Sequence, residues 1–285
     1  MIGDIIVYGA TLSALWMLVA CGFTLMYGVT EIVNMAYGVS YALAAYIMYL
    51  AALWIGVPPL LSMIIALFVS LAISMAIYQF IIRPVMHSHE LTITVTFIIL
   101  LVATEVFRII FGPEPHHVPM LIRGSVSVFG IPVMLQRLSI LPISLATLLC
   151  LRIFLHKTTT GRAIRAVAQD REAALLMGIN VQRMFLISMV ISTLLCALAG
   201  CLAVPLEVVD PMTAWSPVVP IFAVTILGGL GNIEGAIVAA IVLGYSEVIV
   251  ASVFGSQFRG IVPLIATLLI LQIRPEGLLG RRGRS

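Results

Sequence analysis

Residues 5–30 read IIVYGATLSALWMLVACGFTLMYGVT, an apolar stretch without a single Asp, Glu, Lys or Arg. An α-helix rises about 1.5 Å per residue, so about 20 such residues cross the ~30 Å hydrocarbon core of a bilayer. The stretch is therefore long enough to span a membrane, and we expect a helix near residues 5–27.

The rest of the chain has the same character. Residues 32–82 and 184–206 are also free of charged side chains, and only 9% of the 285 residues are charged, whereas soluble domains have roughly 25%. The longer stretch holds two crossings, because Gly56, Pro58 and Pro59 interrupt it where a tight turn belongs. The sequence predicts an all-α, polytopic bundle of membrane helices.

The pattern gives eight or nine transmembrane or re-entrant helices. We expect them near residues 5–27, 37–56, 58–82, 91–111, 138–156, 184–206, 217–230, 233–254 and 258–274. The segment 217–230 is short enough to be a half-span. A single transmembrane domain then covers residues 1–285, with an external loop at 112–137 and a cytoplasmic loop at 157–183.

The orientation follows from the basic residues, because Lys and Arg accumulate in cytoplasmic loops. One orientation satisfies every loop, provided that 217–230 counts as a crossing: the N-terminus then lies outside and the C-terminus in the cytoplasm. Eleven of the fifteen basic residues then lie inside, namely Arg83, Arg152, Lys157, Arg162, Arg165, Arg171, Arg183, Arg274, Arg281, Arg282 and Arg284.

The external loop contains an alternation of polar and apolar residues at 125–129, SVSVF, followed by Gly130 and then by Ile131-Pro132-Val133. Alternation of this kind around a glycine is typical of a β-hairpin. We expect a small hairpin at the outer surface, with a plain loop as the alternative.

The sequence contains no constellation for catalysis, for cofactor binding or for nucleic-acid binding. A G-x-x-x-x-G-K-[ST] phosphate loop is absent. His87 and His89 lie in a different loop from His116 and His117, and neither pair completes a metal site. Four cysteines lie in apolar stretches without CxxC spacing and are interpreted as packing residues: Cys21, Cys150, Cys196 and Cys201.

The cytoplasmic loop carries the most informative stretch, residues 160–179, TGRAIRAVAQDREAALLMGI. Its apolar residues recur at helical spacing, and Gly178 is placed to end a helix in the left-handed conformation. We expect one or two short helices. Two roles are open from this pattern: anchoring of the loop to lipid headgroups, or coupling of the loop to a cytoplasmic motor.

Several motifs of the chain resemble the branched-chain amino acid permeases of bacterial ATP-binding-cassette (ABC) importers, of the LivH type. Glu172-Ala173-Ala174, followed by Gly178, is similar to the EAA motif of importer permeases. Five more similarities follow the family's order along nearly the whole chain: residues 27–38, Arg83-Pro84, FGPE at 111–114, LGGLGN at 227–232 with Gly235, and RPEGL at 274–278. The chain departs from the family's usual pattern at Met35-Ala36-Tyr37 and at Glu234.

The resemblance implies a non-catalytic permease in the bacterial inner membrane that forms half of a translocation pathway. Its partners would be a second, LivM-like permease, two cytoplasmic ATPases and an external substrate-binding protein. ATP and Mg would bind to the ATPases, and the permease itself would hold no cofactor. The residues that it assigns to ATPase coupling are Arg162, Arg165, Asp170, Glu172, Ala173 and Gly178.

Two segments, 28–38 and 228–235, interrupt apolar helix with glycines, an asparagine and a carboxylate. Broken helices at membrane depth often line a permeation path, although close helix packing through glycine explains them equally well. The pathway candidates from these breaks are Asn34, Tyr37, Gly38, Asn232 and Glu234. Two charged residues within other spans, Glu105 and Glu247, are added to them.

Ionisable residues within spans are costly and are usually functional. Glu105 and Arg108, three residues apart, are expected to pair on one helix face. Glu247 has no obvious local partner. We expect both glutamates to face the interior or a partner permease.

Alternatives to the amino-acid cargo are urea, short amides or another small carboxylate. The alternative to ABC transport is an autonomous ion-coupled transporter that uses Glu105, Arg108, Glu234 and Glu247. It predicts uptake by the purified chain alone.

Overall fold

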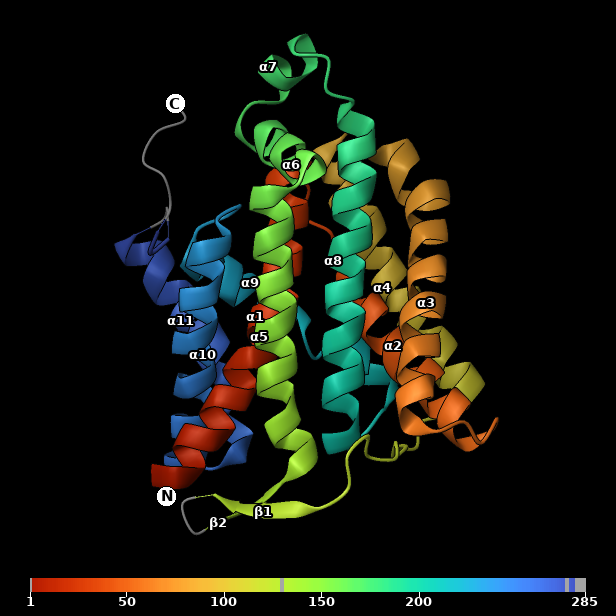
Figure 1. Cartoon of the computed structure of the whole chain (residues 1–285), viewed down its shortest axis with the longest axis vertical. Coiled ribbons are helices and arrows are strands. Elements are labelled where there is room, and N and C mark those ends of the chain that lie inside the picture. Colours follow the sequence, from red (N-terminus) through yellow and green to blue (C-terminus); the bar gives the residue numbers. More distant parts are fainter. Residues whose placement is uncertain (1, 129–130, 275–276, 280–285) are drawn as a thin grey trace. The chain divides into compact units, whose positions relative to one another are not determined.

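The computed structural model describes residues 2–128, 131–274 and 277–279, and the chain in these ranges is almost entirely helical (Figure 1). The helices are α1 (Ile2–Thr30), α2 (Tyr37–Leu53), α3 (Pro59–Ile77), α4 (His89–Phe111), α5 (Leu135–Lys157), α6 (Thr159–Gln169), α7 (Arg171–Leu176), α8 (Val181–Ala203), α9 (Val218–Gly228), α10 (Ile233–Phe254) and α11 (Ile261–Ile273). These bounds confirm the predicted helical membrane architecture, with differences of a few residues at the helix ends.

Eight of the described helical segments are long and apolar enough to cross a membrane. The remaining apolar helix, α2, has 17 residues. Helix α9 has only 11 residues, which is about 16 Å of helix, but a 3₁₀ turn at Pro211–Ala214 precedes it and lengthens the apolar segment. The predicted short segment at 217–230 therefore exists.

The chain forms two compact units, each assembled from separate parts of the sequence. Unit 1 comprises Met1–Glu31, Ile140–Ser192 and Ile221–Ser285, and unit 2 comprises Ile32–Ser139 and Thr193–Pro220. Helices α5 and α8 each contribute residues to both units.

Within unit 1, α1 and α10 run antiparallel at close distance. The Cα of Gly9 faces the Tyr245 ring, and the Cα of Gly244 faces Ser13, whose hydroxyl donates to the Ile241 carbonyl at 3.3 Å. Small residues let two helix backbones approach in this way. Because lipid tails are as apolar as the side chains, the hydrophobic effect does not hold membrane helices together, and the dispersion contacts of such close packing do so instead. The start of α1 and helix α6 lie at opposite ends of this unit (Figure 1).

Within unit 2, the first turns of α2 are buried and closely packed. A Cβ on Gly38 would overlap the Ala214 carbonyl, and one on Gly200 would lie 2.6 Å from the Tyr41 carbonyl oxygen. The hydroxyl groups of Ser40 and Ser74 share a hydrogen bond of 3.0 Å, which links α2 to α3.

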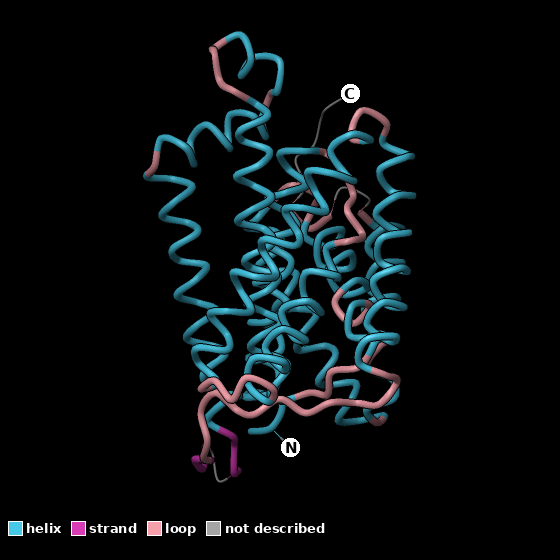
Figure 2. Tube along the Cα trace, turned by 90° about the vertical axis from the view of Figure 1, so that its right-hand side faces the viewer, coloured by secondary structure: helices cyan, strands magenta, loops and turns pink. Residues whose placement is uncertain are grey.

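The predicted hairpin is present. Strand β1 (Ser125–Val128) pairs antiparallel with β2 (Ile131–Met134), from Ser125 opposite Met134 to Val128 opposite Ile131. Figure 2 shows the two strands in magenta. Phe129, the last residue of the alternating stretch, and Gly130 lie outside the described residues.

Gln136, at the start of α5, is fully buried and holds the loop before the hairpin. Its Oε1 accepts the N–H groups of Leu121 at 3.1 Å and Ile122 at 3.3 Å, and its Nε2 donates to the Leu202 carbonyl at 3.4 Å. One amide side chain thus satisfies three backbone groups and ties the loop to the end of α8.

The four cysteines are free thiols. Cys21, Cys196 and Cys201 are buried, and the Cys196 thiol donates to the Tyr37 carbonyl at 3.3 Å, in agreement with a packing role. Cys150 differs from the prediction because it lies on the exposed side of α5.

Candidate functional site

The predicted cytoplasmic loop forms two short helices, α6 and α7. Thr158 begins α6, because its Oγ1 accepts the Gly161 N–H at 2.9 Å. Gly161 lies so close to the end of α5 that a Cβ there would overlap the Phe154 carbonyl. Ile164 and Val167 are buried, and α6 contacts α1. The apolar side of α6 therefore packs against protein.

Helix α7 is short but closed at both ends by its own sequence. The Asp170 carboxylate accepts the Ala173 N–H at 2.9 Å at the start of the helix. At the other end, Gly178 has φ +78°, its N–H bonds the Leu175 carbonyl at 3.0 Å, and the Ile179 N–H bonds the Ala174 carbonyl at 3.0 Å. This Schellman arrangement confirms the predicted left-handed cap at Gly178.

The tip of α7 exposes apolar side chains. Leu176 is 89% exposed and Met177 82% exposed, and Leu175 beside them is also exposed, whereas Ala174 is buried. Glu172 and Ala173 lie on the exposed side. A contiguous group of exposed apolar residues at the end of a capped, six-residue helix is typical of a protein-contact site.

The six residues assigned to ATPase coupling differ in their surroundings. Asp170, Glu172, Ala173 and Gly178 lie together in or next to α7. Arg162 is exposed on α6. Arg165 points back toward the bundle instead, because its Nε donates to the Leu155 carbonyl of α5 at 3.0 Å. Arg165 thus positions α6 against α5.

The first predicted break is real. Helix α1 ends at Thr30, and Glu31 adopts φ +57°, the one left-handed non-glycine residue in the described chain. Within unit 2, the Met35 N–H donates to Thr96 Oγ1 of α4 at 3.2 Å, so a threonine satisfies a freed backbone group. Asn34, Tyr37 and Gly38 are buried in the packing of this unit.

The second break, at 228–235, is closed by backbone contact and by the C-terminal segment. A Cβ on Gly235 would overlap the Gly228 carbonyl, and Gly28 lies against Gly231. Asn232 Oδ1 accepts the Gly235 N–H at 3.1 Å, so Asn232 begins α10. Here the structure supports helix packing through glycine.

Residues 277–279 lie against this break. The Leu278 N–H donates to the Leu227 carbonyl at 2.7 Å, and Asn232 Nδ2 donates to the Leu279 carbonyl at 2.7 Å. The terminal motif, of which Pro275 and Glu276 lie outside the described residues, therefore satisfies backbone groups that the break releases. Glu234, another pathway candidate, is exposed.

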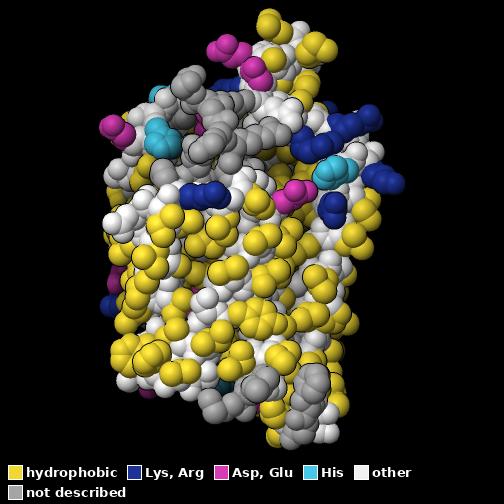
Figure 3. All heavy atoms as spheres, turned by 90° about the vertical axis from the view of Figure 1, so that its left-hand side faces the viewer, with side chains coloured by type: hydrophobic (Ala, Val, Ile, Leu, Met, Phe, Trp, Pro, Cys, Tyr) yellow, Lys and Arg dark blue, Asp and Glu magenta, His cyan; other side chains and the backbone are white. Residues whose placement is uncertain are grey.

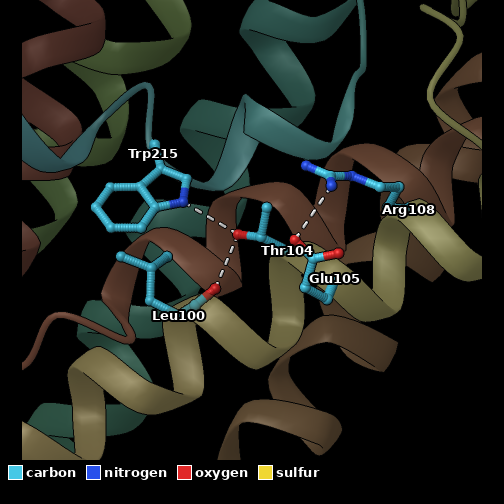
Figure 4. A network of polar contacts seen from close by, with 5 residues as sticks. All are labelled: Leu100, Thr104, Glu105, Arg108 and Trp215. Atoms are coloured by element: carbon cyan, nitrogen blue, oxygen red, sulfur yellow. Dashed lines mark hydrogen bonds and ion pairs between the residues drawn. The ribbon is translucent and has the colours of Figure 1, made fainter.

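Glu105 and Arg108 form the predicted ion pair on α4, with 3.4 Å between the Glu105 Oε1 and an Arg108 guanidinium nitrogen (Figure 4). The two side chains are 58% and 46% exposed, so Glu105 does not face the interior of this chain. That half of the prediction is wrong, because the buried side of the helix turn is occupied by Thr104 and Phe107. A partner-facing role remains a prediction.

Thr104 organises the buried side of the same turn. The Trp215 Nε1 donates to Thr104 Oγ1 at 3.1 Å, and the Thr104 hydroxyl donates to the Leu100 carbonyl at 2.8 Å (Figure 4). The Trp215 ring also meets Phe97 edge to face at 5.9 Å. Trp215 was missed from the sequence, because it lies 111 residues from Thr104 and follows no periodic pattern.

Glu247 on α10 has a partner that the sequence did not indicate. The Arg259 Nε lies 3.1 Å from Glu247 Oε2, across the connection between α10 and α11. The Glu247 side chain is 3% exposed and that of Arg259 is 41% exposed. A buried carboxylate is thus held by a guanidinium that reaches it from the surface.

We expect the two halves of this ion pair to respond unequally to substitution. Arg259→Gln should lower the melting temperature more than Glu247→Gln, because it leaves a buried carboxylate without its guanidinium. Arg259→Gln should lower the free energy of unfolding by an amount near the lower end of the roughly 3–5 kcal/mol known for breaking buried ion pairs, since Arg259 is partly hydrated. Thermal unfolding in detergent measures the order, and the double variant should be more stable than Arg259→Gln. Equal melting temperatures for both single variants would contradict this account.

The described residues contain no group of three or more His, Cys, Asp or Glu side chains that could hold a metal ion. His116 instead lies in the connection between α4 and β1, where its Nε2 bonds the Phe111 carbonyl at 3.0 Å and its ring lies 4.6 Å from that of Tyr49. His116 and Val209 also exchange backbone hydrogen bonds of 2.8 and 2.9 Å.

Comparison with known proteins places these features in a family. Residues 5–271 match the model of the permease component of the branched-chain amino acid transport system. The chain is 27% identical to the high-affinity branched-chain amino acid permease LivH of Salmonella typhimurium, over 96% of this chain and 94% of that one. It is 28% identical to BraD of Pseudomonas aeruginosa, over 97% and 95%.

A further relative and a solved structure are also similar to this chain. A probable LivH of Methanocaldococcus jannaschii is 30% identical over 94% of this chain and 89% of its own. The structure of PsaBC from Streptococcus pneumoniae in complex with Fab superposes with a TM-score of 0.53 over 97% of both chains, at 15% identity, which is a similarity of fold.

Proposed function

Because this chain belongs to the family of branched-chain amino acid transport permeases, we propose that its helix α7 receives the movement of a separate ATPase and passes it to the membrane helices. Membership of this family means that the chain is an ABC transport permease and a multi-pass protein of the inner membrane. The observation that carries the mechanical proposal is the exposed tip of α7, Leu175, Leu176 and Met177, on a helix capped at both ends.

The attachment of α6 supports transmission of force. Gly161 abuts the end of α5, Arg165 bonds the Leu155 carbonyl, and Ile164 and Val167 are buried. A force applied to α7 therefore reaches α5 through backbone contact and a charge-assisted hydrogen bond, neither of which yields easily. Asp170 joins α6 to α7, and its carboxylate accepts the Ala173 N–H at 2.9 Å, so the same residue ends one helix and begins the next.

The energy source lies on other polypeptides in this proposal. The sequence carries no phosphate loop, so ATP and Mg²⁺ would bind to two cytoplasmic ATPases. A second, LivM-like permease would complete the pathway, and an external binding protein would deliver the substrate. The cargo we propose is a branched-chain amino acid, as named for the relatives.

The orientation proposed is N-terminus outside and C-terminus in the cytoplasm. In it the basic segment that contains α6 and α7 faces the ATPases. Antiparallel packing of α1 and α10 places Gly28 beside Gly231. Both breaks then lie toward the end where force would enter.

Reconstitution tests the function. Proteoliposomes that contain this chain, the second permease and the ATPases should accumulate radiolabelled leucine when the binding protein is supplied on the external side and ATP on the side of the ATPases. Vesicles with this chain alone should show only background uptake. Full-rate leucine uptake by the chain alone, in vesicles without ATP, would overturn the proposal and favour an autonomous transporter.

A further inference from the structure

The exposed face of α5 changes from apolar to basic along one line. Leu145, Leu149, Arg152 and His156 follow one another at spacings of four, three and four residues, which keeps them on one side of the helix. All four are exposed. The apolar half of this line suits the acyl region of a bilayer, and the basic half lies at the end of the span, where headgroups begin.

Helix α6 adds cationic side chains at the same place. The chain turns at Thr158, whose Oγ1 also donates to the Phe154 carbonyl at 2.7 Å, and a Cβ on Gly161 would lie 2.6 Å from the Leu155 Cα. Lys157 and Arg162, on either side of this turn, are exposed. The last turn of α5 and the first turn of α6 thus present cations from two directions.

Among the described residues, none of these three cations forms an ion pair within 4.0 Å with a carboxylate. The ion pairs Arg108–Glu105 and Arg259–Glu247 involve other helices. Arg152, Lys157 and Arg162 take part in neither. Figure 3 shows Lys and Arg side chains, with an acidic side chain beside them, at the edge of a broad apolar surface.

The apolar side of α6 excludes a simpler membrane anchor. An interfacial helix inserts its apolar face among lipids, but Gly161, Ile164 and Val167 are buried against protein. What α6 and α5 leave available to the membrane is charge above an apolar stripe. That combination fits a molecule with an anionic head and a hydrocarbon tail.

We propose that Arg152, Lys157 and Arg162 bind the phosphate headgroup of an anionic phospholipid whose acyl chain lies along Leu145 and Leu149. The guanidinium groups supply paired N–H donors and the ammonium a point charge, as phosphate recognition requires. The two short helices then have different partners: α6 is steadied by lipid, and α7 contacts the ATPase. Lipid binding is a property of this chain alone and does not depend on the proposed transport function.

The test uses the purified full chain in neutral detergent, without ATPases. Native mass spectrometry with added phosphatidylglycerol or phosphatidylcholine measures the affinity for each lipid. We expect phosphatidylglycerol to bind at least tenfold more tightly. Each Lys or Arg near an anionic headgroup contributes about a fivefold gain in affinity, so R152Q/K157Q/R162Q should lose at least tenfold in phosphatidylglycerol binding with phosphatidylcholine binding unchanged.

The matched control, R83Q/R123Q/R183Q, removes the same charge from exposed arginines elsewhere and should keep the preference. Equal loss in the control, or no preference in the native chain, would overturn the proposal. Displacement of phosphatidylglycerol by equimolar inorganic phosphate would also overturn it, since the site would then bind free anions. Melting temperatures within about 2 °C of the native chain establish that both variants are folded.

Discussion

Leu176→Glu is expected to lower leucine uptake by the reconstituted transporter at least tenfold and to leave the thermal stability of the chain unchanged. The side chain is 89% exposed, so its replacement removes no packing within the chain. A leucine that is buried on docking contributes about 1.5–3 kcal/mol, and a carboxylate forced into the same contact adds a desolvation cost. The loss should therefore appear only in the assembled transporter.

The measurement combines uptake in proteoliposomes with co-purification of the ATPase subunits. Thr159→Glu is the matched control, because it adds the same charge to an exposed position of the same loop, at the start of α6, where a carboxylate suits the helix dipole. Normal uptake by Leu176→Glu, with the ATPases still bound, would contradict the role of α7.

Gly235→Val is expected to destabilise the folded chain by about 3 kcal/mol or more and to abolish uptake. A Cβ at this position overlaps the carbonyl group of Gly228, and a backbone atom cannot move aside as the end of a flexible side chain can. The segment between α9 and α10 would have to move, and this movement would break the contact between Gly231 and Gly28.

Thermal unfolding in detergent, followed by size-exclusion chromatography, measures this effect. Gly260→Ala provides the control, because nothing lies within 4 Å of a Cβ there and its φ of −67° suits alanine. The control should differ from the native chain by less than about 0.5–1 kcal/mol. A Gly235→Val chain that melts with the control would show that the break tolerates movement.

Much of the fold could be predicted because its signals are local. The length of each apolar stretch predicts a span whatever lies beside it, and the alternation at Ser125–Val128 predicts the hairpin from a few residues. The cap at Gly178 follows from a glycine after an apolar helical pattern. The family likewise followed from short motifs in a given order.

The sites that sequence reasoning missed depend on contacts between distant residues. Arg259 meets Glu247 across a helix connection, Trp215 meets Thr104 from 111 residues away, and the C-terminal Leu278 closes the break at Leu227. Glu105, expected to face the interior or a partner, proved half exposed, since a charge within a span does not by itself tell which helix face is buried. Each of these contacts requires the path of the chain in three dimensions.

The sequence alone determined that the chain crosses a membrane many times, where its helices break, and that a capped helix follows α6, because hydrophobic length, glycine and capping residues act on their own neighbourhood. Only the tertiary structure decided that Gly235 touches Gly228 and that Arg165 donates a hydrogen bond to α5. It also decided that α6 buries its apolar side whereas α7 exposes its own. The physical reason is that burial and pairing depend on which segments fold side by side, and no local pattern encodes that choice.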